Sequence, residues 1–453
     1  MKKQHFSLQP ALIFVLTLLI ITAACDSTET IDDQLQTVIA QQKITPLDPG
    51  PTQDPAKVKL GQALFFDKIL SGNKDISCAT CHHPTQNSGD SLPVSIGTGG
   101  VGVGVTRQIG HDRVLIPRNA PEVFNRGAGE WTTMFWDSRV AMGEDGSFIS
   151  PADDRLPDGL DNVLAVQAMF PVTSGDEMRG AQGDVDVTGV ANELAEIDGQ
   201  DLPGIWAGLM VRLLVNPEYV ALFQAAYPQI PSEELGFEDA ANAIASFEID
   251  AYTLANSPWQ QYLNGNLAAL SPEAKQGALL FYGEAGCVIC HSGPLFTDQR
   301  HHALAVPQVG PGRGDEAPQD LGRFRETSST ADKYAFRTPP LHNVAVTGPW
   351  MHDGAFSTLE ATVQHHLDPE TSLREYDTAV HLPGPLRSTF QNAPELIEEM
   401  LHYLDAQLAP SRTLSPPEAN NLITFLEALT DPAMVNLHQV TPDSVPSGLP
   451  ILD

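Results

Sequence analysis

Two short stretches decide the fold of this chain, Cys78-Ala79-Thr80-Cys81-His82 and Cys287-Val288-Ile289-Cys290-His291. Each has the spacing C-x-x-C-H, which is the attachment motif of c-type haem. The spacing follows from the chemistry, because two thiols add to the haem vinyl groups and the adjacent histidine ligates the iron. Zinc is the alternative for paired C-x-x-C motifs, but here both pairs carry the histidine directly. Two covalent haems are therefore predicted, with these attachment residues and iron ligands: Cys78, Cys81, Cys287, Cys290, His82 and His291.

A related helix is predicted before each motif. Residues 59–66 (KLGQALFF) and 275–282 (KQGALLFY) share the pattern K-x-G-x-x-L-F-aromatic. The second helix has a clear start, with Ser271 as N-cap and Pro272 as its first residue. The repeat indicates two cytochrome c-like domains that arose by duplication. Strand signals are few, so the predicted fold class is mainly α.

The predicted domains are unequal in length. The N-terminal haem domain covers residues 54–266 and carries a large insertion, and the C-terminal haem domain covers residues 267–435. Residues 436–453 are predicted to be a frayed tail. The glycine-rich segment 97–110 lacks the strand and helix context of a nucleotide-binding loop, which favours a mobile loop.

The N-terminus is predicted to direct export. Lys2, Lys3 and the apolar stretch 11–24 are typical of a signal peptide over residues 1–24, and the stretch is too short to span a bilayer. Small residues before Cys25 resemble a bacterial lipobox, which predicts a membrane-tethered periplasmic lipoprotein. Ordinary cleavage before Cys25 is the alternative. Residues 25–53 are polar and are predicted to form a tether.

The composition restricts the partners of this chain. The 57 acidic residues against 25 Lys and Arg give a formal charge of −32. This charge argues against a nucleic-acid-binding protein, because such proteins require a basic surface. The charge favours basic protein partners, which it would attract over long distances.

Further motifs support a resemblance that covers about residues 55–430. They are Asn119-Ala120-Pro121, Phe135-Trp136-Asp137-Ser138-Arg139, Glu177-Met178, Phe336-Arg337-Thr338-Pro339-Pro340-Leu341-His342-Asn343 and Pro349-Trp350-Met351-His352-Asp353-Gly354. With the two haem motifs, in this order, they resemble the bacterial di-haem cytochrome c peroxidase family, which includes MauG-type enzymes. In that family the C-terminal haem relays electrons and the N-terminal haem reacts with peroxide.

The resemblance assigns roles to three side chains near the haems. Trp136 matches a tryptophan that lies between the two haems and carries electrons. Gln167 and Glu177 match a pair above the peroxidatic haem, where a positioned carboxylate can move the protons that O–O cleavage requires.

The resemblance also implies one calcium ion between the domains. Its ligands would include Asn119 and the backbone carbonyl groups of Thr338 and Pro340, and oxygen-only ligation suits this ion. A dimer is usual in the family, so a homodimer is a further expectation.

His111 is the candidate sixth ligand of the N-terminal haem. It lies eight residues before Asn119 and at the end of the glycine-rich segment. Classical peroxidases of the family place a removable histidine there, whereas MauG-type enzymes lack one. The alternative is a solvated loop histidine.

The C-terminal haem departs from the family pattern. The family places Met or Tyr at the sixth ligand position, but here the matching position holds His366. Residues 357–360 (STLE) have the pattern of a capping box, which predicts a helix that begins near residue 358. On this helix Leu359, Val363 and His366 share one face, whereas His365 points elsewhere. His366 is therefore the predicted partner of His291, and histidine in place of Met would lower the haem potential.

These features predict an exported di-haem oxidoreductase. The favoured activity is reduction of hydrogen peroxide to water, with electrons from a small cytochrome c or cupredoxin. One alternative is a MauG-type enzyme that oxidises residues of a partner protein. Another is a di-haem electron carrier without catalysis, against which the presence of Gln167, Glu177 and Trp136 argues.

Overall fold

The structure is a computed structural model that describes Met1 and residues 29–451. The predicted signal peptide and Cys25 lie outside the described residues. The fold is mainly helical, as the sequence predicts. The helices and strands up to residue 263 are α1 (Ile31–Gln42), α2 (Pro55–Phe66), α3 (Cys78–Cys81), β1 (Thr133–Met134), β2 (Val140–Met142), β3 (Phe148–Ile149), α4 (Val163–Ala168), α5 (Leu202–Leu214), α6 (Pro217–Ala226), α7 (Phe237–Tyr252) and α8 (Pro258–Leu263).

The rest of the chain adds seven more helices and two strands within the described residues. They are α9 (Pro272–Tyr282), β4 (His301–Ala303), α10 (Phe324–Thr327), β5 (Ala335–Arg337), α11 (Leu359–Leu367), α12 (Pro369–Arg374), α13 (Thr378–His381), α14 (Pro394–His402) and α15 (Pro416–Glu427). Strands β1, β2 and β3 form one antiparallel sheet, and β4 pairs antiparallel with β5, with His301 opposite Arg337. Within residues 29–451 no single helix is long and apolar enough to cross a membrane, although the bent pair α5 and α6 passes that test by length and composition alone.

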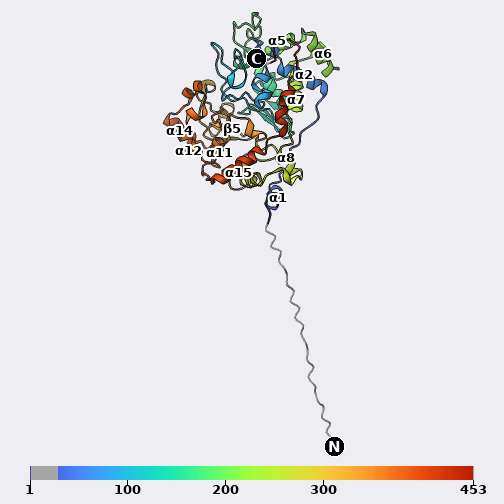
Figure 1. Ribbon diagram of the computed structural model, residues 1–453. Helices are drawn as coiled ribbons and strands as arrows, with labels where there is room; N and C mark the ends of the chain where they lie inside the picture. The colour runs from blue at the N-terminus through green and yellow to red at the C-terminus, as the bar shows by residue number, and fades with distance from the viewer. Residues whose placement is uncertain (2–28, 452–453) are drawn as a thin grey trace.

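The glycine of each repeated helix lies where two helices cross in close contact. Helix α2 crosses α7, and a Cβ atom on Gly61 would come within 1.8 Å of the Ala243 carbonyl oxygen. Helix α9 crosses α15, and a Cβ atom on Gly277 would come within 1.9 Å of the Asn421 carbonyl oxygen. Only glycine permits this approach. The repeat in the sequence therefore marks the same helix crossing in both halves (Figure 1).

Two large hydrophobic cores lie behind these crossings. The first gathers α2, α4, α5, α6 and α7, with Phe65, Phe247 and Tyr252 in mutual ring contact. The second gathers α8, α9 and α15 around Trp259, whose ring stacks on that of Tyr262. Helix α8 therefore packs with the second half, although the sequence placed residues 258–263 in the first domain.

The predicted tether is largely a packed segment. Helix α1 begins at a capping box in which the Thr30 hydroxyl group accepts a hydrogen bond from the Asp33 backbone N–H. Leu35 is fully buried in the second core, and Asp32 forms an ion pair with Lys275 of α9 at 2.8 Å. Residues 31–47 therefore pack on the protein instead of forming a tether, because Leu35 and Leu47 are buried and other apolar side chains are partly buried. Figure 1 shows α1 beside α8 and α15.

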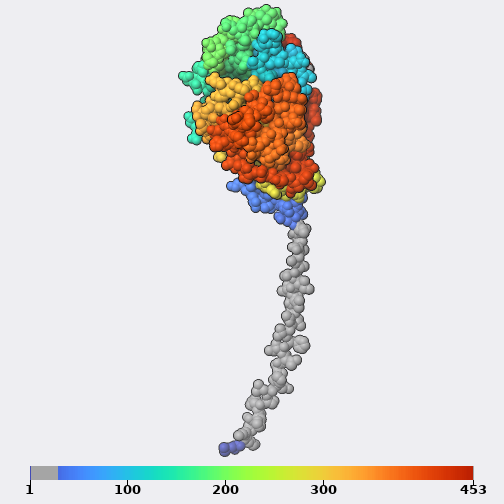
Figure 2. Space-filling model, turned by 90° about the vertical axis from the view of Figure 1, so that its left-hand side faces the viewer, coloured from blue at the N-terminus to red at the C-terminus, as the bar shows by residue number. Residues whose placement is uncertain are grey.

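The predicted frayed tail is also packed, but against the first half. Leu437 and Val445 are buried in the first core. The Ser447 hydroxyl group donates a hydrogen bond to the buried Asp67 carboxylate at 2.6 Å, and Asn216 binds the Pro446 carbonyl group. The two terminal segments of the described chain thus exchange halves. In Figure 2 the orange and red C-terminal half lies between the blue N-terminal segment and the cyan and green first half.

Candidate haem sites and active site

The first C-x-x-C-H motif forms the buried helical turn α3. The Ser77 backbone N–H donates to the Thr80 hydroxyl group at 3.1 Å, which fixes the start of the turn. His82 follows directly, and its Nδ1 lies 3.3 Å from the Ser88 carbonyl oxygen. Burial lowers the pKa of His82 and raises the pKa of the Cys78 thiol to about 12. A neutral imidazole with an oriented Nδ1 is the form that binds a metal ion through Nε2.

The second motif forms a 3₁₀ turn over Cys287–Ile289 at the surface, with His291 just inside. The Nδ1 of His291 lies 3.0 Å from the Phe296 carbonyl oxygen. Burial, with the nearby His366 ring, lowers the pKa of His291 to about 4. Its imidazole is therefore neutral and has its Nε2 available to iron.

His366 faces His291 at the distance that an iron ion between two imidazoles requires. The two ring centres are 6.2 Å apart. Two metal–nitrogen bonds of about 2 Å each, with the offset of each nitrogen from its ring centre, come to about 6 Å. The Nδ1 of His366 lies 2.8 Å from the Thr362 carbonyl oxygen, so its Nε2 is also available. These two side chains fit a haem iron.

Helix α11 explains how this geometry arises. Its N-cap is Thr358, whose hydroxyl group accepts a hydrogen bond from the Ala361 N–H, so the predicted cap at residue 357 is one residue too early. Leu359, Val363 and His366 all line one cavity, as the predicted helix face requires. His365 is fully buried on another side, where its Nε2 contacts the Leu304 carbonyl group.

The cavity around His291 and His366 reaches the junction of the two halves. Its apolar lining includes Leu304, Val306, Leu341, Val363, Leu367, Leu422 and Leu426. Trp136 also lines it, and the Trp136 indole N–H donates to the Asn119 carbonyl group at 3.0 Å. Pro121, two residues further, lines the same cavity and presents its carbonyl group to the His82 ring. Trp136 is thus bonded to a segment that touches both sites.

Glu177 lies on the side of the first attachment turn that faces Cys81. It sits in a π-helical turn over Gly175–Arg179, whose position is fixed by a hydrogen bond from the Thr98 N–H to the Glu177 carbonyl group at 2.9 Å. Burial raises the pKa of Glu177, while Arg139 and Arg313 oppose this rise. Glu177 in turn contributes to the raised pKa of the Cys81 thiol.

Gln167 and His111 are the other residues that the sequence assigns to this site. Gln167 is half-buried on α4, the helix that packs on α7. The His111 side chain is 92% exposed and forms an ion pair with Asp112 at 2.6 Å. The structure therefore places His111 in solvent and not on the buried site. The glycine-rich segment is fixed at its base, because the Arg107 guanidinium group donates to the carbonyl groups of Ile96, Gly97 and Gly102.

The three predicted calcium ligands all line this cavity. The Thr338 carbonyl oxygen already accepts hydrogen bonds from the Thr297 hydroxyl group and from Arg337. The Asn119 amide donates to the Leu92 carbonyl group at 2.7 Å. These contacts occupy the Thr338 carbonyl group that calcium would need, so the residues as placed do not fit the ion.

A buried ion network at the junction was not singled out from the sequence. Arg118 pairs with Asp320 through Nε at 2.6 Å and with Asp137 through NH1 at 2.6 Å. Asp137 also accepts from Arg139 at 3.0 Å, and nearby arginines hold its pKa far below the usual range. Asp137 and Arg118 come from the first half and Asp320 from the second, so the network joins the two halves.

Glu248 was also not singled out from the sequence, because no local pattern distinguishes it from the other acidic residues among the 57. It lies on α7, is 6% exposed, and burial raises its pKa to about 8. It also contributes to the raised pKa of the Cys78 thiol, which places it near the first attachment turn.

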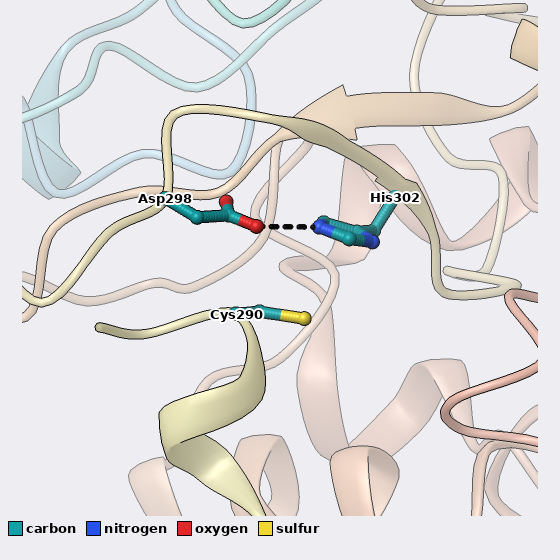
Figure 3. Close-up of side chains that lie close together, drawn as sticks. All are labelled: Cys290, Asp298 and His302. Atoms are coloured by element: carbon teal, nitrogen blue, oxygen red, sulfur yellow. Dashed lines mark hydrogen bonds and ion pairs between the residues drawn. The ribbon is translucent and has the colours of Figure 1, made fainter. Parts of the chain in front are cut away.

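A second missed cluster surrounds Cys290 (Figure 3). The His302 ring contacts Asp298 at 3.0 Å through Nε2 and Asp405 at 2.6 Å through Nδ1. The hydrogen bonds that the His302 ring donates to Asp298, Cys290 and Asp405 raise the pKa of His302 to about 11, so the ring is protonated at neutral pH. Cys290, Asp298 and His302 are ligand types that metals use. Haem attachment would consume the Cys290 thiol, which leaves a charged clamp beside the attachment turn.

Comparisons with known proteins agree with this architecture. A family model described as di-haem cytochrome c peroxidase matches residues 55–268. Methylamine utilization protein MauG of Methylorubrum extorquens is 30% identical over 390 residues, which cover 85% of this chain and 82% of that protein. Cytochrome c551 peroxidase of Pseudomonas aeruginosa is 29% identical over 322 residues, which cover 71% and 74% of the two chains.

Solved structures show the same fold. The crystal structure of a MauG-like protein associated with microbial copper homeostasis aligns with a TM-score of 0.59 at 24% identity and covers 88% of this chain and 96% of that one. The diheme peroxidase BthA of Burkholderia thailandensis aligns with a TM-score of 0.55 at 20% identity, covering 86% and 91%.

Membership of a family follows from the extent of these matches. The relatives are named both as cytochrome c peroxidases and as MauG, and they span both halves of the chain. The two C-x-x-C-H motifs are the attachment sites that two c-type haems require. The chain is an oxidoreductase of the cytochrome c peroxidase type and belongs to the di-haem cytochrome c peroxidase family, which includes MauG.

Proposed function

We propose that this protein reduces hydrogen peroxide to water at the site around His82. The observation that carries the proposal is the contrast between the two sites. His291 is faced by His366, which would occupy the sixth iron position there. The His82 site is instead approached by Glu177, a partly buried carboxyl group with a raised pKa. A small oxidant can therefore bind only at the first site.

The chain supplies the proton chemistry of this reaction. Reduction of one hydrogen peroxide to two waters takes up two electrons and two protons. Bound haem supplies the iron at which that reduction takes place. Glu177 can accept a proton from the near oxygen of peroxide and return it to the departing oxygen, because burial raises the pKa of its carboxyl group and so makes it a stronger base. The Gln167 amide can orient the peroxide by hydrogen bonds.

Electrons are proposed to enter through the second half. Ile289 of the second attachment turn is 49% exposed, so a partner can approach this site closely. The charge of −32 favours a basic donor, such as a small cytochrome c or a cupredoxin. Trp136 lines the cavity around His291 and His366 and is hydrogen-bonded to Asn119, in the segment that contacts His82. It therefore offers a route for electrons between the two sites.

A MauG-type activity on a partner protein is the second candidate. The observation that favours it is His366, because a histidine in place of Met gives a low-potential second haem that is poorly suited as an electron reservoir. His111, which would close the first site in a peroxidase, is exposed.

Peroxide consumption by the purified holoprotein with ascorbate-reduced cytochromes and cupredoxins tests the proposal. Sustained turnover is expected, and E177Q should lower kcat by about 100-fold or more. The matched control is D176N, which removes the exposed neighbouring acid. Unchanged turnover in E177Q would contradict the proton-transfer role. Absence of turnover with every donor, while peroxide still changes the Soret spectrum, would favour the MauG-type activity.

Three further expectations belong to this proposal. Cys25 is proposed to carry the lipid anchor of a periplasmic protein, and globomycin treatment should make the uncleaved precursor accumulate in the membrane fraction. A homodimer is testable by light scattering. Because the Thr338 carbonyl group is occupied and does not fit a calcium ligand, turnover should survive chelation with EGTA.

A further inference from the structure

The ionisable side chains that line the cavity around His291 and His366 have an unusual charge balance. Acidic residues outnumber Lys and Arg by 57 to 25 in the whole chain. The cavity lining reverses this ratio, with three arginines and one carboxylate. These charged residues are Arg126, Arg337, Arg412 and Glu122, and the histidines that line the cavity with them are His291, His302, His352 and His366.

Two of these arginines are deeply buried at the inner end, where the two halves meet. Arg126 is 6% exposed and Arg337 is 4% exposed. Arg126 forms an ion pair with Glu122, but the bonds of the Arg337 side chain go to the carbonyl groups of Phe135 at 3.1 Å and Thr338 at 3.3 Å. The inner end therefore holds two cations and one anion.

The third arginine lies at the other end of the cavity. Arg412 is close to Gly286 and lowers the pKa of the Cys287 thiol, so it sits at the attachment turn. This turn is at the surface, since Ile289 is half exposed. The cavity thus runs from an exposed attachment edge to a buried cationic end.

The chemistry of haem matches this polarity. The vinyl groups that bond to cysteine and the two propionate groups lie on opposite edges of the porphyrin. Thioether bonds at Cys287 and Cys290 therefore direct the propionate edge toward the interior. Burying carboxylates without cationic partners costs several kcal/mol per group, and a buried cation in excess carries a similar cost.

We propose that Arg126 and Arg337 form the binding site for the propionate carboxylates of the haem attached at Cys287 and Cys290. Glu122 neutralises Arg126, so the positive charge of Arg337 is not balanced by the carboxylate that lines the cavity. The Arg126 guanidinium carbon lies 4.2 Å from the centre of the Trp131 ring. The inference rests on the haem attachment that family membership implies and is independent of peroxidase activity.

The test is the pH dependence of the midpoint potential of this haem in R337Q holoprotein, measured by spectroelectrochemistry. In the wild type the guanidinium groups keep the propionates ionised, so we expect a midpoint that is constant between pH 5.5 and 8.5. In R337Q a propionate should titrate in this range. The midpoint should then fall as the pH rises, by up to tenfold in the reduced-to-oxidised ratio per pH unit, which is 59 mV for one electron.

The chain offers a matched control at the same junction. Arg323 also donates to backbone carbonyl groups, those of Asp137 and Ser138, but does not line the cavity. R323Q should keep the constant midpoint of the wild type, and R337K should largely keep it because the charge remains. A constant midpoint in R337Q would overturn the proposal.

A measurement on the wild type covers the case in which R337Q does not fold. Haem with carbon-13 in its propionate carboxyl groups would give identifiable bands in infrared redox-difference spectra at pH 5.5. Carboxylate bands alone would support the proposal. A band from a protonated propionate of the second haem would refute it.

Discussion

The two haem-attachment turns share a scaffold and differ in their surroundings. Beneath each lies a helix crossing closed by one glycine, Gly61 or Gly277. In the first turn Ala79 and Thr80 are 2% and 4% exposed, whereas Ile289 in the second is 49% exposed. The duplicated crossing thus holds a haem in either half. The segments added around it decide whether that haem meets solvent, a second ligand or a buried acid.

The largest expected effect is the loss of the second iron ligand. H366A should abolish the six-coordinate low-spin state of the second haem, because the variant lacks the imidazole that faces His291. The near-infrared and Soret spectra of the first haem should not change. The control is H365Q, which alters the adjacent buried histidine that contacts the Leu304 carbonyl group and should leave both haem spectra intact. Identical spectra in H366A and wild type would remove the structural distinction between the two sites.

A glycine-to-alanine substitution in each half, which adds one methyl group, tests the shared helix crossing. G61A and G277A should each lower the free energy of unfolding by about 3 kcal/mol, because the added Cβ atom meets a backbone carbonyl oxygen. Chemical denaturation of the holoproteins measures this loss. G129A is the control, since a Cβ atom there has no neighbour within 4 Å. A loss in only one of the two variants would show that the crossings are not equivalent.

Glu248 gives the first half a pH dependence that the second half lacks at the matching helix. Its folded-state pKa of about 8 lies above the ordinary value, so the unfolded chain loses this proton at a lower pH than the folded protein does. The unfolding free energy of the wild type should therefore fall as the pH rises from about 5 to 8. E248Q lacks this proton and should be more stable than the wild type at pH 8 by about 2 kcal/mol, with a smaller gap at pH 5.

Thermal unfolding at several pH values measures this difference. D250N provides a control on the same helix, because Asp250 is exposed. Parallel pH profiles for E248Q and the wild type would contradict the buried-acid assignment.

The smallest expected effect concerns the exposed second turn. I289K should lower kcat/KM for a basic donor about fivefold, because it adds a like charge and removes apolar contact area where the donor docks. The KM for peroxide should not change. V435K makes the same change at a remote position that is 77% exposed and should have no effect. Equal values for I289K and V435K would move donor entry away from this turn.

The sequence predicts the scaffold well and its surroundings less well. The C-x-x-C-H motifs, the start of α9 at Ser271 and the helix that carries His366 depend on local patterns, and the structure has them within one residue. The reason for the repeated glycine is a contact between helices about 150 residues or more apart, which no local pattern contains. The ion network of Arg118, Asp137 and Asp320 is likewise non-local.

The ends of the chain show why composition misled. Residues 25–53 and 436–453 are polar on average, and this predicts a tether and a frayed tail. Burial depends on a few positions, chiefly Leu35 in one segment and Leu437 and Val445 in the other. In the same segments Asp32 pairs with Lys275 and Ser447 binds Asp67, which are distant in the chain, so only the folded structure reveals these contacts.

This exchange of chain ends sets the order in which the molecule can be completed during synthesis. The first core lacks Leu437 and Val445 until the segment that follows α15 has been made, although all its helices are made much earlier. The second core, by contrast, can recruit Leu35 from a segment that has been present since the beginning. The half that is made first is therefore the half that closes last. Its Cys78 and Cys81 therefore pack against a core that cannot be complete until this late segment joins it.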